Sequence, residues 1–261
     1  HGARWISKDQ RNKAIELGLQ PLSPVEVLAI HLQDTVRMHA DILLSRDATH
    51  QLVEQLRELA PTAVRELIPE LLSLGQLQQV LRNLLSEKIS IRPLAEILEA
   101  LSEVARQQQH PIKLTEHVRS RLARSITTSL SDTDGLRVLS LRPEIEQQIG
   151  DTLNFTDIDL EVTYVHQLHD RLCQEIQRHL ELSKEEQGTT ALVVAPEIRP
   201  GVARLMQQQL IPIPVISTRE VSRGVDIVSH HQLNMAPTPS THRSDTPAFS
   251  SLEPVTREDV N

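Results

Sequence analysis

The chain has 261 residues, and its 39% hydrophobic and 24% charged content is ordinary for a globular protein with an aliphatic core. Aromatic residues make up only 2%, and the net charge is −8 without a long basic run, which argues against nucleic-acid binding. One cysteine excludes an internal disulfide and a cysteine-rich metal site and favours a reducing compartment, and no apolar run approaches the roughly 18 residues of a membrane-spanning helix.

Residues 1–45 predict the end of a strand followed by two helices. Ala3–Ile6 has strand character, and a short helix over Lys8–Leu17 is expected to stop at Gly18, a left-handed cap. Ser23, Pro24 and Glu26 give the next helix a cap, a first-turn proline and a returning carboxylate. This helix is expected to be long and half buried through the apolar side chains of Val25, Leu28, Ala29, Leu32, Val36, Ala40 and Leu43.

Residues 46–130 predict a helical scaffold. Asp47 is a candidate cap for a helix that turns Leu52, Val53, Leu56 and Leu59 inward, and Ser73 and Gln76 have capping-box spacing before a leucine-rich face. Glu87–Arg92 is β-branched and precedes Pro93, so an extended corner is expected there, with Pro93 in the first turn of the next helix. A last helix over Leu114–Thr127 repeats apolar residues every fourth position, with Arg119, Arg121 and Arg124 on its other sides.

Residues 131–233 predict a small α/β unit beyond a turn-rich boundary at Ser129–Gly135. Strands are expected at 136–141, 191–195, 212–216 and 225–228, and helices at 143–153, 160–182 and 196–210. The sheet is predicted to be mixed because the last two strands are close in sequence. Residues 184–188 are predicted to form a polar loop. Residues 234–261 are rich in Pro, Ser and Thr and are predicted to be a disordered tail. The predicted fold class is α+β, mainly α: a helical superhelix or bundle followed by a small mixed α/β subdomain.

The candidate chemistry is sparse. His166 and His169 lie at i and i+3 on a helix but lack a third ligand, and Cys173 is better explained as a small buried hydrophobe than as a nucleophile. Glycine-rich phosphate loops and nucleophile elbows are absent from the sequence. These features favour a non-enzymatic interaction module without cofactor or metal. Two alternatives stay open: an α/β enzyme with a site at the strand ends near Pro196 and Ser217, and a helix-turn-helix DNA binder using residues 73–105, which the negative charge disfavours.

The residues also carry a resemblance to a known family. The runs that carry it are Ala3-Arg-Trp-Ile6, Val27–Leu32, Glu66-Leu-x-Pro69, Leu81-x-Asn-Leu-Leu85, Ser90-Ile-Arg92, Ile97–Leu101, Leu114–Arg119 and, within Ala191–Ser217, Ile198-Arg-Pro200 and Pro214–Ser217. Over about residues 3–229 the chain resembles the cytosolic part of the FHIPEP family, the large export-gate proteins of flagellar and virulence type III secretion. Ile198-Arg-Pro200 favours the flagellar branch. Pro93 departs from the family pattern, which has Asp after Ser-Ile-Arg.

The resemblance implies a role in protein transport rather than catalysis. The full protein would have an N-terminal membrane region, and this chain would be a fragment of its cytosolic part, on the cytoplasmic face of the bacterial inner membrane. The first 45 residues would be the remnant of a first subdomain, and 46–130 would make most contacts of a homo-nonameric ring. The implied partners are other copies, chaperone–substrate complexes, the export ATPase complex and other gate proteins. Candidate subunit-interface residues are Arg46, Asp47, Arg92 and Arg119, charged residues in family-like runs at expected helix ends.

Overall fold

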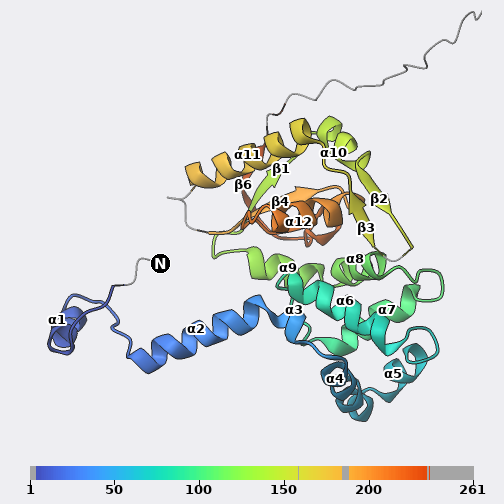
Figure 1. The fold of residues 1–261 in the computed structure, drawn as a ribbon, viewed down its shortest axis with the longest axis horizontal. Helices are drawn as coiled ribbons and strands as arrows, with labels where there is room; N and C mark the ends of the chain where they lie inside the picture. Colours follow the sequence, from blue (N-terminus) through green and yellow to red (C-terminus); the bar gives the residue numbers. More distant parts are fainter. Residues whose placement is uncertain (1–3, 158, 184–187, 234, 236–261) are drawn as a thin grey trace, which may run out of the picture.

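The computed structural model describes residues 4–157, 159–183, 188–233 and 235. It shows an N-terminal arm, a helical body and an α/β part stacked on that body (Figure 1). None of the helices in these ranges is both long and apolar enough to cross a membrane. Of the predicted tail only Met235 is described, and it is buried beside α11 and α12; the predicted loop at 184–188 falls outside these ranges except for Gly188.

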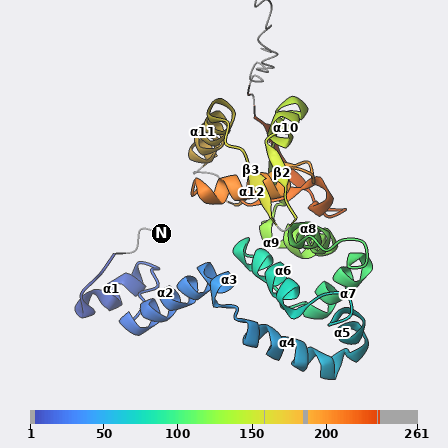
Figure 2. The ribbon, with the colours of Figure 1, turned by 45° about the vertical axis from the view of Figure 1, so that its right-hand side comes forward.

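The arm contains η1 (Lys8–Gln10), α1 (Arg11–Glu16), α2 (Pro24–Met38) and α3 (Ala40–Leu43). Both predicted capping boxes form, at Ser7 and Ser23, and Gly18 takes the expected positive φ of 75°. Two expectations are wrong. Arg4–Ile6 is not a strand, because no other strand of the described residues lies beside it. The second helix is not half buried, since α2 projects away from the body without a buried residue (Figures 1 and 2).

The helical body is built from six helices: α4 (Arg46–Leu59), α5 (Pro61–Leu67), α6 (Leu74–Ser86), α7 (Leu94–Val104), α8 (Pro111–Arg121) and α9 (Ala123–Leu130). The capping box at Ser73 starts α6, whose Leu77, Val80, Leu81 and Leu84 are buried as their spacing predicts. Ser45, rather than Asp47, caps α4, because its hydroxyl accepts the N–H of Ala48 at 3.0 Å. Leu59 is exposed, not inward.

Two further boundaries in this body differ from expectation. Pro93 is the N-cap of α7 and not its first residue, so α7 begins without a capping side chain. The predicted helix over Leu114–Thr127 is two helices, α8 and α9, with a break at Leu122. The four-residue repeat still holds across the break, since Leu114, Val118, Leu122 and Ile126 are all buried. Periodicity therefore predicted the buried face but not the break.

The α/β part contains a four-stranded sheet in the order β5-β4-β1-β6 and a separate hairpin, β2-β3. The strands are β1 (Leu136–Ser140), β2 (Leu153–Phe155), β3 (Leu160–Val162), β4 (Thr190–Val194), β5 (Val215–Ser217) and β6 (Ile227–Gln232). All four strands of the sheet are parallel, and only the hairpin is antiparallel. The reason given for a mixed sheet is wrong, because β5 and β6 occupy opposite edges. The hairpin was not predicted, and it replaces the start of the helix expected at 160–182.

Helices cover both faces of this sheet. Side chains from α10 (Pro143–Gly150), α11 (His166–Leu182) and α12 (Arg199–Gln208) pack against Leu139, Leu192, Val194 and Val215. The other face, with Leu136, Val138, Ala191, Val193 and Ile216, belongs to the same core as the helical body. Burial on both faces explains the continuous apolar run of β4. The segment from β5 to β6, which includes η3 (Thr218–Glu220), contacts α8 and α9.

Candidate functional site

The junction between the helical body and the α/β part contains a buried ionic cluster, which we call the junction cluster: Glu87, Glu116, Arg119, Arg199 and Glu220. Arg199, the first residue of α12, has a side chain that is only 2% exposed. Its guanidinium donates to both carboxylate oxygens of Glu116, with Nε at 2.6 Å from Oε2, and to both oxygens of Glu87, with Nη2 at 3.1 Å from Oε1. A residue of α8 and the C-cap residue of α6 thus hold the start of α12 through one side chain.

Arg119 holds the other side of the junction. Its Nε donates to Oε1 of Glu220 at 2.6 Å, its Nη2 to Oε2 of Glu220 at 3.0 Å and its Nη1 to Glu87 at 3.0 Å. The Nη2 group also donates to the carbonyl oxygen of Val215 at 3.2 Å, and the Ser217 N–H donates to Glu220 at 2.9 Å. The Arg119–Glu220 pair therefore occupies outward backbone groups of β5, the edge strand nearest the body.

The cluster has three carboxylates and two guanidinium groups, so its charges do not balance when all are ionised. Burial alone would raise the pKa of Glu87, but Arg199 and Arg119 more than offset it, and the pKa of this carboxyl lies below its ordinary value. For Glu116 burial dominates over the attraction of Arg199, and the pKa is raised. Burial would lower the pKa of Arg199, yet the carboxylates of Glu87 and Glu116 raise it. Burial thus favours the neutral form of Glu116, whereas the two arginines favour the charged form of Glu87.

Two hollows adjoin the cluster. One has a volume of about 80 Å³ and is lined by Glu87, Glu116 and Arg199 among others. The other, of about 480 Å³, lies between the α6 turn, α9, α12 and the residues leading into β5, with Ile89, Met206 and Ile213 in its wall and Glu87 and Arg119 at its polar side. Glu87, Glu116, Arg119 and Arg199, which line these hollows, are already paired with one another or with Glu220. This arrangement is suited to fixing one subdomain on the other rather than to turning over a substrate.

The structure separates the four predicted interface residues. Arg46, Asp47 and Arg92 are exposed on the helical body, and the guanidinium of Arg46 lies over Gly75, where an added Cβ would be only 2.3 Å from Nη2. Their interface role stays a prediction. Arg119 is different, because its side chain is 2% exposed and its bonds run inside the chain. Placing it on an outer side of its helix was wrong: Glu220, about a hundred positions away, draws it inward.

Other candidate residues have unremarkable surroundings. His166 is exposed and His169 is buried, and no group of three or more potential metal ligands occurs among the described residues. Cys173 is buried, and this burial raises its pKa to about 11, the opposite of what a nucleophile needs. At the strand ends, the Ala195 N–H is bound by Glu146 and the Ser217 N–H by Glu220. Neither hollow at the junction is lined by Pro196 or Ser217.

Sequence reasoning missed Glu87, Glu116, Arg199 and Glu220. One signal for Arg199 was available: a cation at the first position of a helix opposes the helix dipole, so it needs a carboxylate partner from elsewhere. Glu220 had a signal too, since Ser217 and Glu220 form a capping box at η3. Neither signal identifies the partner, because Arg199 lies 83 and 112 positions from Glu116 and Glu87.

Comparison with known proteins gives a consistent result. The FHIPEP family model matches residues 1–226. The chain is 30% identical over 228 residues to the flagellar biosynthesis protein FlhA of Bacillus subtilis, covering 87% of this chain and 34% of the relative. It is 31% identical over 221 residues to FlhA of Escherichia coli, covering 84% of this chain and 31% of that protein. The chain thus spans about a third of the length of these curated relatives.

Solved structures share the fold. The Chlamydia pneumoniae CdsV protein superimposes with a TM-score of 0.76 at 25% identity, covering 89% of this chain and 67% of that one. CdsV in its complex with CdsO gives a TM-score of 0.79 at 24% identity, covering 87% and 67%. The nonameric SctV-C of EPEC gives 0.72 at 22% identity, covering 87% and 68%.

Proposed function

The chain belongs to the FHIPEP family, and from that premise we propose that it is a non-enzymatic, ring-forming part of a type III protein export gate. The observation that carries the proposal is the family match, which runs through the arm, the helical body and nearly all of the α/β part. Structural relatives of the same fold include nonameric assemblies. A repeated, head-to-tail contact between copies closes into such a ring.

The helical body offers the surface for this contact. It carries the exposed Arg46 and Asp47 at the start of α4, and the exposed Arg92 lies at the corner before α7. The junction cluster supports assembly indirectly, because it fixes the α/β part on the body and so holds each copy in one shape. We assign the proposed ring contact to residues 46–130.

The proposed partners and place follow from the family. The chain would take part in receiving chaperone–substrate complexes and would work beside the export ATPase complex and other gate proteins, at the cytoplasmic face of a bacterial inner membrane. A relative, CdsV, is known in complex with CdsO. The Ile198-Arg-Pro200 run and the FlhA relatives favour the flagellar branch.

The test is self-association of the chain tethered to lipid vesicles, where local concentration mimics a ring, measured by chemical cross-linking. Oligomers of more than two copies are expected, and Arg46→Glu combined with Arg92→Glu should reduce them. Arg178→Glu, an exposed change on α11 outside residues 46–130, is the matched control. A chain that stays monomeric on vesicles would contradict the ring. Equal yields of cross-linked oligomer from the double variant and from the Arg178→Glu control would show that Arg46 and Arg92 do not form the interface.

The enzyme alternative has no comparable observation in its favour. It requires an open polar pocket at the ends of β4 and β5, whereas Ser217 is 3% exposed and backbone N–H groups there are bound by Glu146 and Glu220. The relatives reported above are named for flagellar biosynthesis and secretion, not for a reaction.

A further inference from the structure

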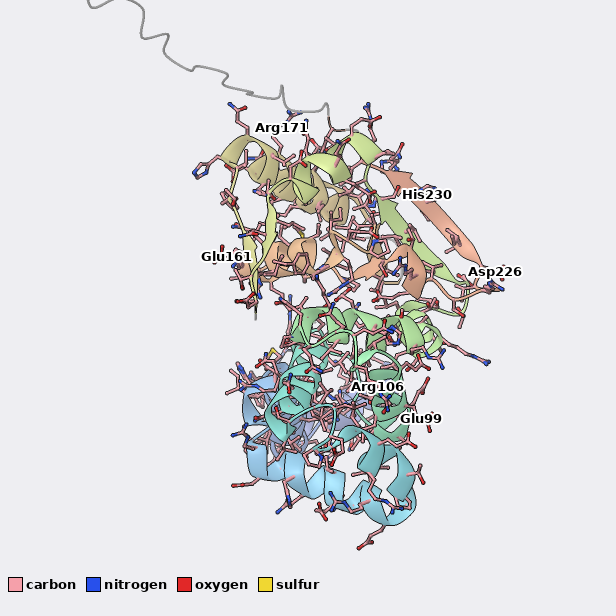
Figure 3. The ribbon with its side chains drawn as sticks, turned by 90° about the vertical axis from the view of Figure 1, so that its right-hand side faces the viewer. Glu99, Arg106, Glu161, Arg171, Asp226 and His230 are labelled. Atoms are coloured by element: carbon pink, nitrogen blue, oxygen red, sulfur yellow. The ribbon has the colours of Figure 1, made fainter. Side chains whose placement is uncertain are left out.

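The two edges of the four-stranded sheet differ in whether other described residues bind their outward backbone groups. At the β5 edge, the Arg119–Glu220 pair binds the carbonyl oxygen of Val215 and the N–H of Ser217. At the β6 edge, no further strand of the described residues lies outside β6. Figure 3 shows β6 along the outer side of the α/β part, with Asp226 at one end and His230 farther along. Only one edge is closed.

The backbone of β6 presents unused hydrogen-bonding groups to the outside. Leu233 donates its N–H to Ser140 at 2.9 Å, and His231 and Gln232 are paired in register with Leu139 and Ser140. Because the groups that reach one neighbouring strand come from alternate residues, Ser229, His231 and Leu233 face β1. The N–H and C=O of His230 and Gln232 therefore face away from the sheet.

This edge also lacks the features with which proteins protect such strands. All six residues of β6 are exposed, and the strand contains neither lysine nor proline. A register irregularity occurs only at its start, between Leu136 and Arg137 of the facing strand. Ile227 and Val228 are apolar yet 53% and 44% exposed. A six-residue, unprotected edge is a template for another strand.

We propose that β6 pairs with β6 of a second copy of this chain, antiparallel across a twofold axis at His230. In this register His230 faces its own equivalent, and Gln232 faces Val228 of the other copy. Ser229 of each copy faces His231 of the other copy on the α11 side of the sheet. The dimer can therefore form two equivalent hydroxyl–imidazole hydrogen bonds. The two four-stranded sheets become one continuous sheet.

The charges around β6 favour this antiparallel orientation. Asp226, exposed, precedes the strand, and Asp132 and Asp134 lie in the turn beside its start, where Gly135 meets the Asp226 carbonyl. Arg142 follows β1 at the other end, where the Gln232 amide lies 3.5 Å from the Leu141 carbonyl oxygen. Asp132 is paired with Arg137, and Arg142 with Glu144. Two parallel copies would place Asp226 beside its own equivalent, whereas two antiparallel copies keep these like charges at opposite ends.

This contact is independent of the proposed ring. The family model ends at residue 226, one residue before β6, so the strand lies outside the matched region. A twofold contact joins identical patches, while a ring uses two different ones. A variant in β6 therefore tests the dimer and leaves the contact proposed for residues 46–130 in place.

The test removes one outward N–H. Gln232→Pro deletes a donor that does not reach β1, and proline is tolerated at such edge positions. Gln232→Thr keeps the donor and is the matched control. Sedimentation velocity of the free chain should show a concentration-dependent dimer. Gln232→Pro should weaken it roughly tenfold or more, since each copy loses a backbone hydrogen bond, and Gln232→Thr should not.

A second measurement tests whether the proposed twofold axis passes at His230. His230→Cys should form a disulfide-linked dimer under mild oxidation, because facing residues of a hydrogen-bonded antiparallel pair have Cα atoms about 5.5 Å apart. Arg178→Cys, exposed on α11, is the control for random collision. The proposal is overturned if the chain is monomeric in solution, if Gln232→Pro dimerises like the unchanged chain, or if Cys at 230 cross-links no faster than Cys at 178.

Discussion

Glu87 is the residue on which the junction depends most, because both buried arginines bind it. Arg199 and Arg119 approach its carboxylate from α12 and α8, and its own helix, α6, ends one residue earlier. Glu116 accepts hydrogen bonds from Arg199. The pKa values of the two glutamates are shifted in opposite directions: that of Glu87 is lowered and that of Glu116 is raised.

Substitution of each glutamate by glutamine should show this difference as opposite pH dependences. The folded pKa of Glu87 is lowered, so its stabilisation is present above about pH 4.5 and is lost as pH falls below it. The folded pKa of Glu116 is raised, so the native state loses stability as pH rises from about 4.5 through that pKa. Glu87→Gln should therefore cost more at pH 7 than at pH 4, on the order of 3–5 kcal/mol at pH 7. Glu116→Gln should become more stable relative to the unchanged chain as the pH rises from 4 to 7.

Urea denaturation at both pH values measures these differences. Glu175→Gln is the control, because Glu175 forms an exposed pair with Arg178 whose loss should cost at most about 1 kcal/mol. Parallel pH slopes for the two cluster variants would contradict the assignment.

At the residue scale, sequence reasoning succeeded where the signal is local. Ser23 and Ser73 were identified as caps because the cap and its returning side chain are three positions apart. It failed for Arg119, whose partner Glu220 is brought close only by the complete fold. A charged residue in an amphipathic helix looks the same in sequence whether water or a distant carboxylate receives it.

Among the elements, α7 is a helix that begins without a side-chain cap. Pro93 occupies its N-cap with φ −77° and ψ 54° and offers no side-chain acceptor. Pro93→Asp would supply a carboxylate that accepts the free N–H groups of the first turn. The new backbone N–H at position 93 would in turn donate to the side chain of Glu96, which completes a capping box. Compared with Pro93→Ala, which loses the same proline rigidity, Pro93→Asp should be about 1 kcal/mol more stable in urea denaturation. Equal stabilities would show that water already satisfies these groups.

The apolar face of α2 contributes little to the stability of this chain. Leu28 and Leu32 are 66% and 62% exposed, whereas Leu77 of α6 is fully buried. Leu28→Ser combined with Leu32→Ser should change the free energy of unfolding by less than about 1 kcal/mol. Leu77→Ala should lower it by about 2–5 kcal/mol. Chemical denaturation of both variants checks this, and a large loss from the α2 pair would mean that the face is covered in solution.

Element-scale prediction depended on length. Long periodic segments such as α6 and α7 were placed well, but the hairpin strands, of three residues each, are too short to show alternation. Periodicity also identified an apolar face on α2 without indicating what covers it. The order of strands in the sheet was beyond reach, because neighbours in sequence, β5 and β6, are separated in space by two other strands.

Over the whole molecule, the helical body and one face of the sheet share a single hydrophobic core. Their shared core contains Leu81 and Leu98 from the helices and Val193 and Ile216 from the sheet, and the junction cluster lies beside it. The sequence did indicate the helical and α/β regions in the right order, because composition changes near Ser129. It gave no measure of how firmly they are joined.

The position of β6 has a consequence for synthesis on the ribosome. The helices of the body contact near neighbours in the chain, but β1 pairs with residues about 50 to 90 positions later, so the sheet must form late. β6 is the last of the described strands to emerge, and η3, which precedes it in the chain, contacts α8 and α9. The edge proposed to join two copies therefore exists only once residues 227–232 have emerged and paired with β1. Nascent chains on one messenger RNA cannot pair through it before each has folded.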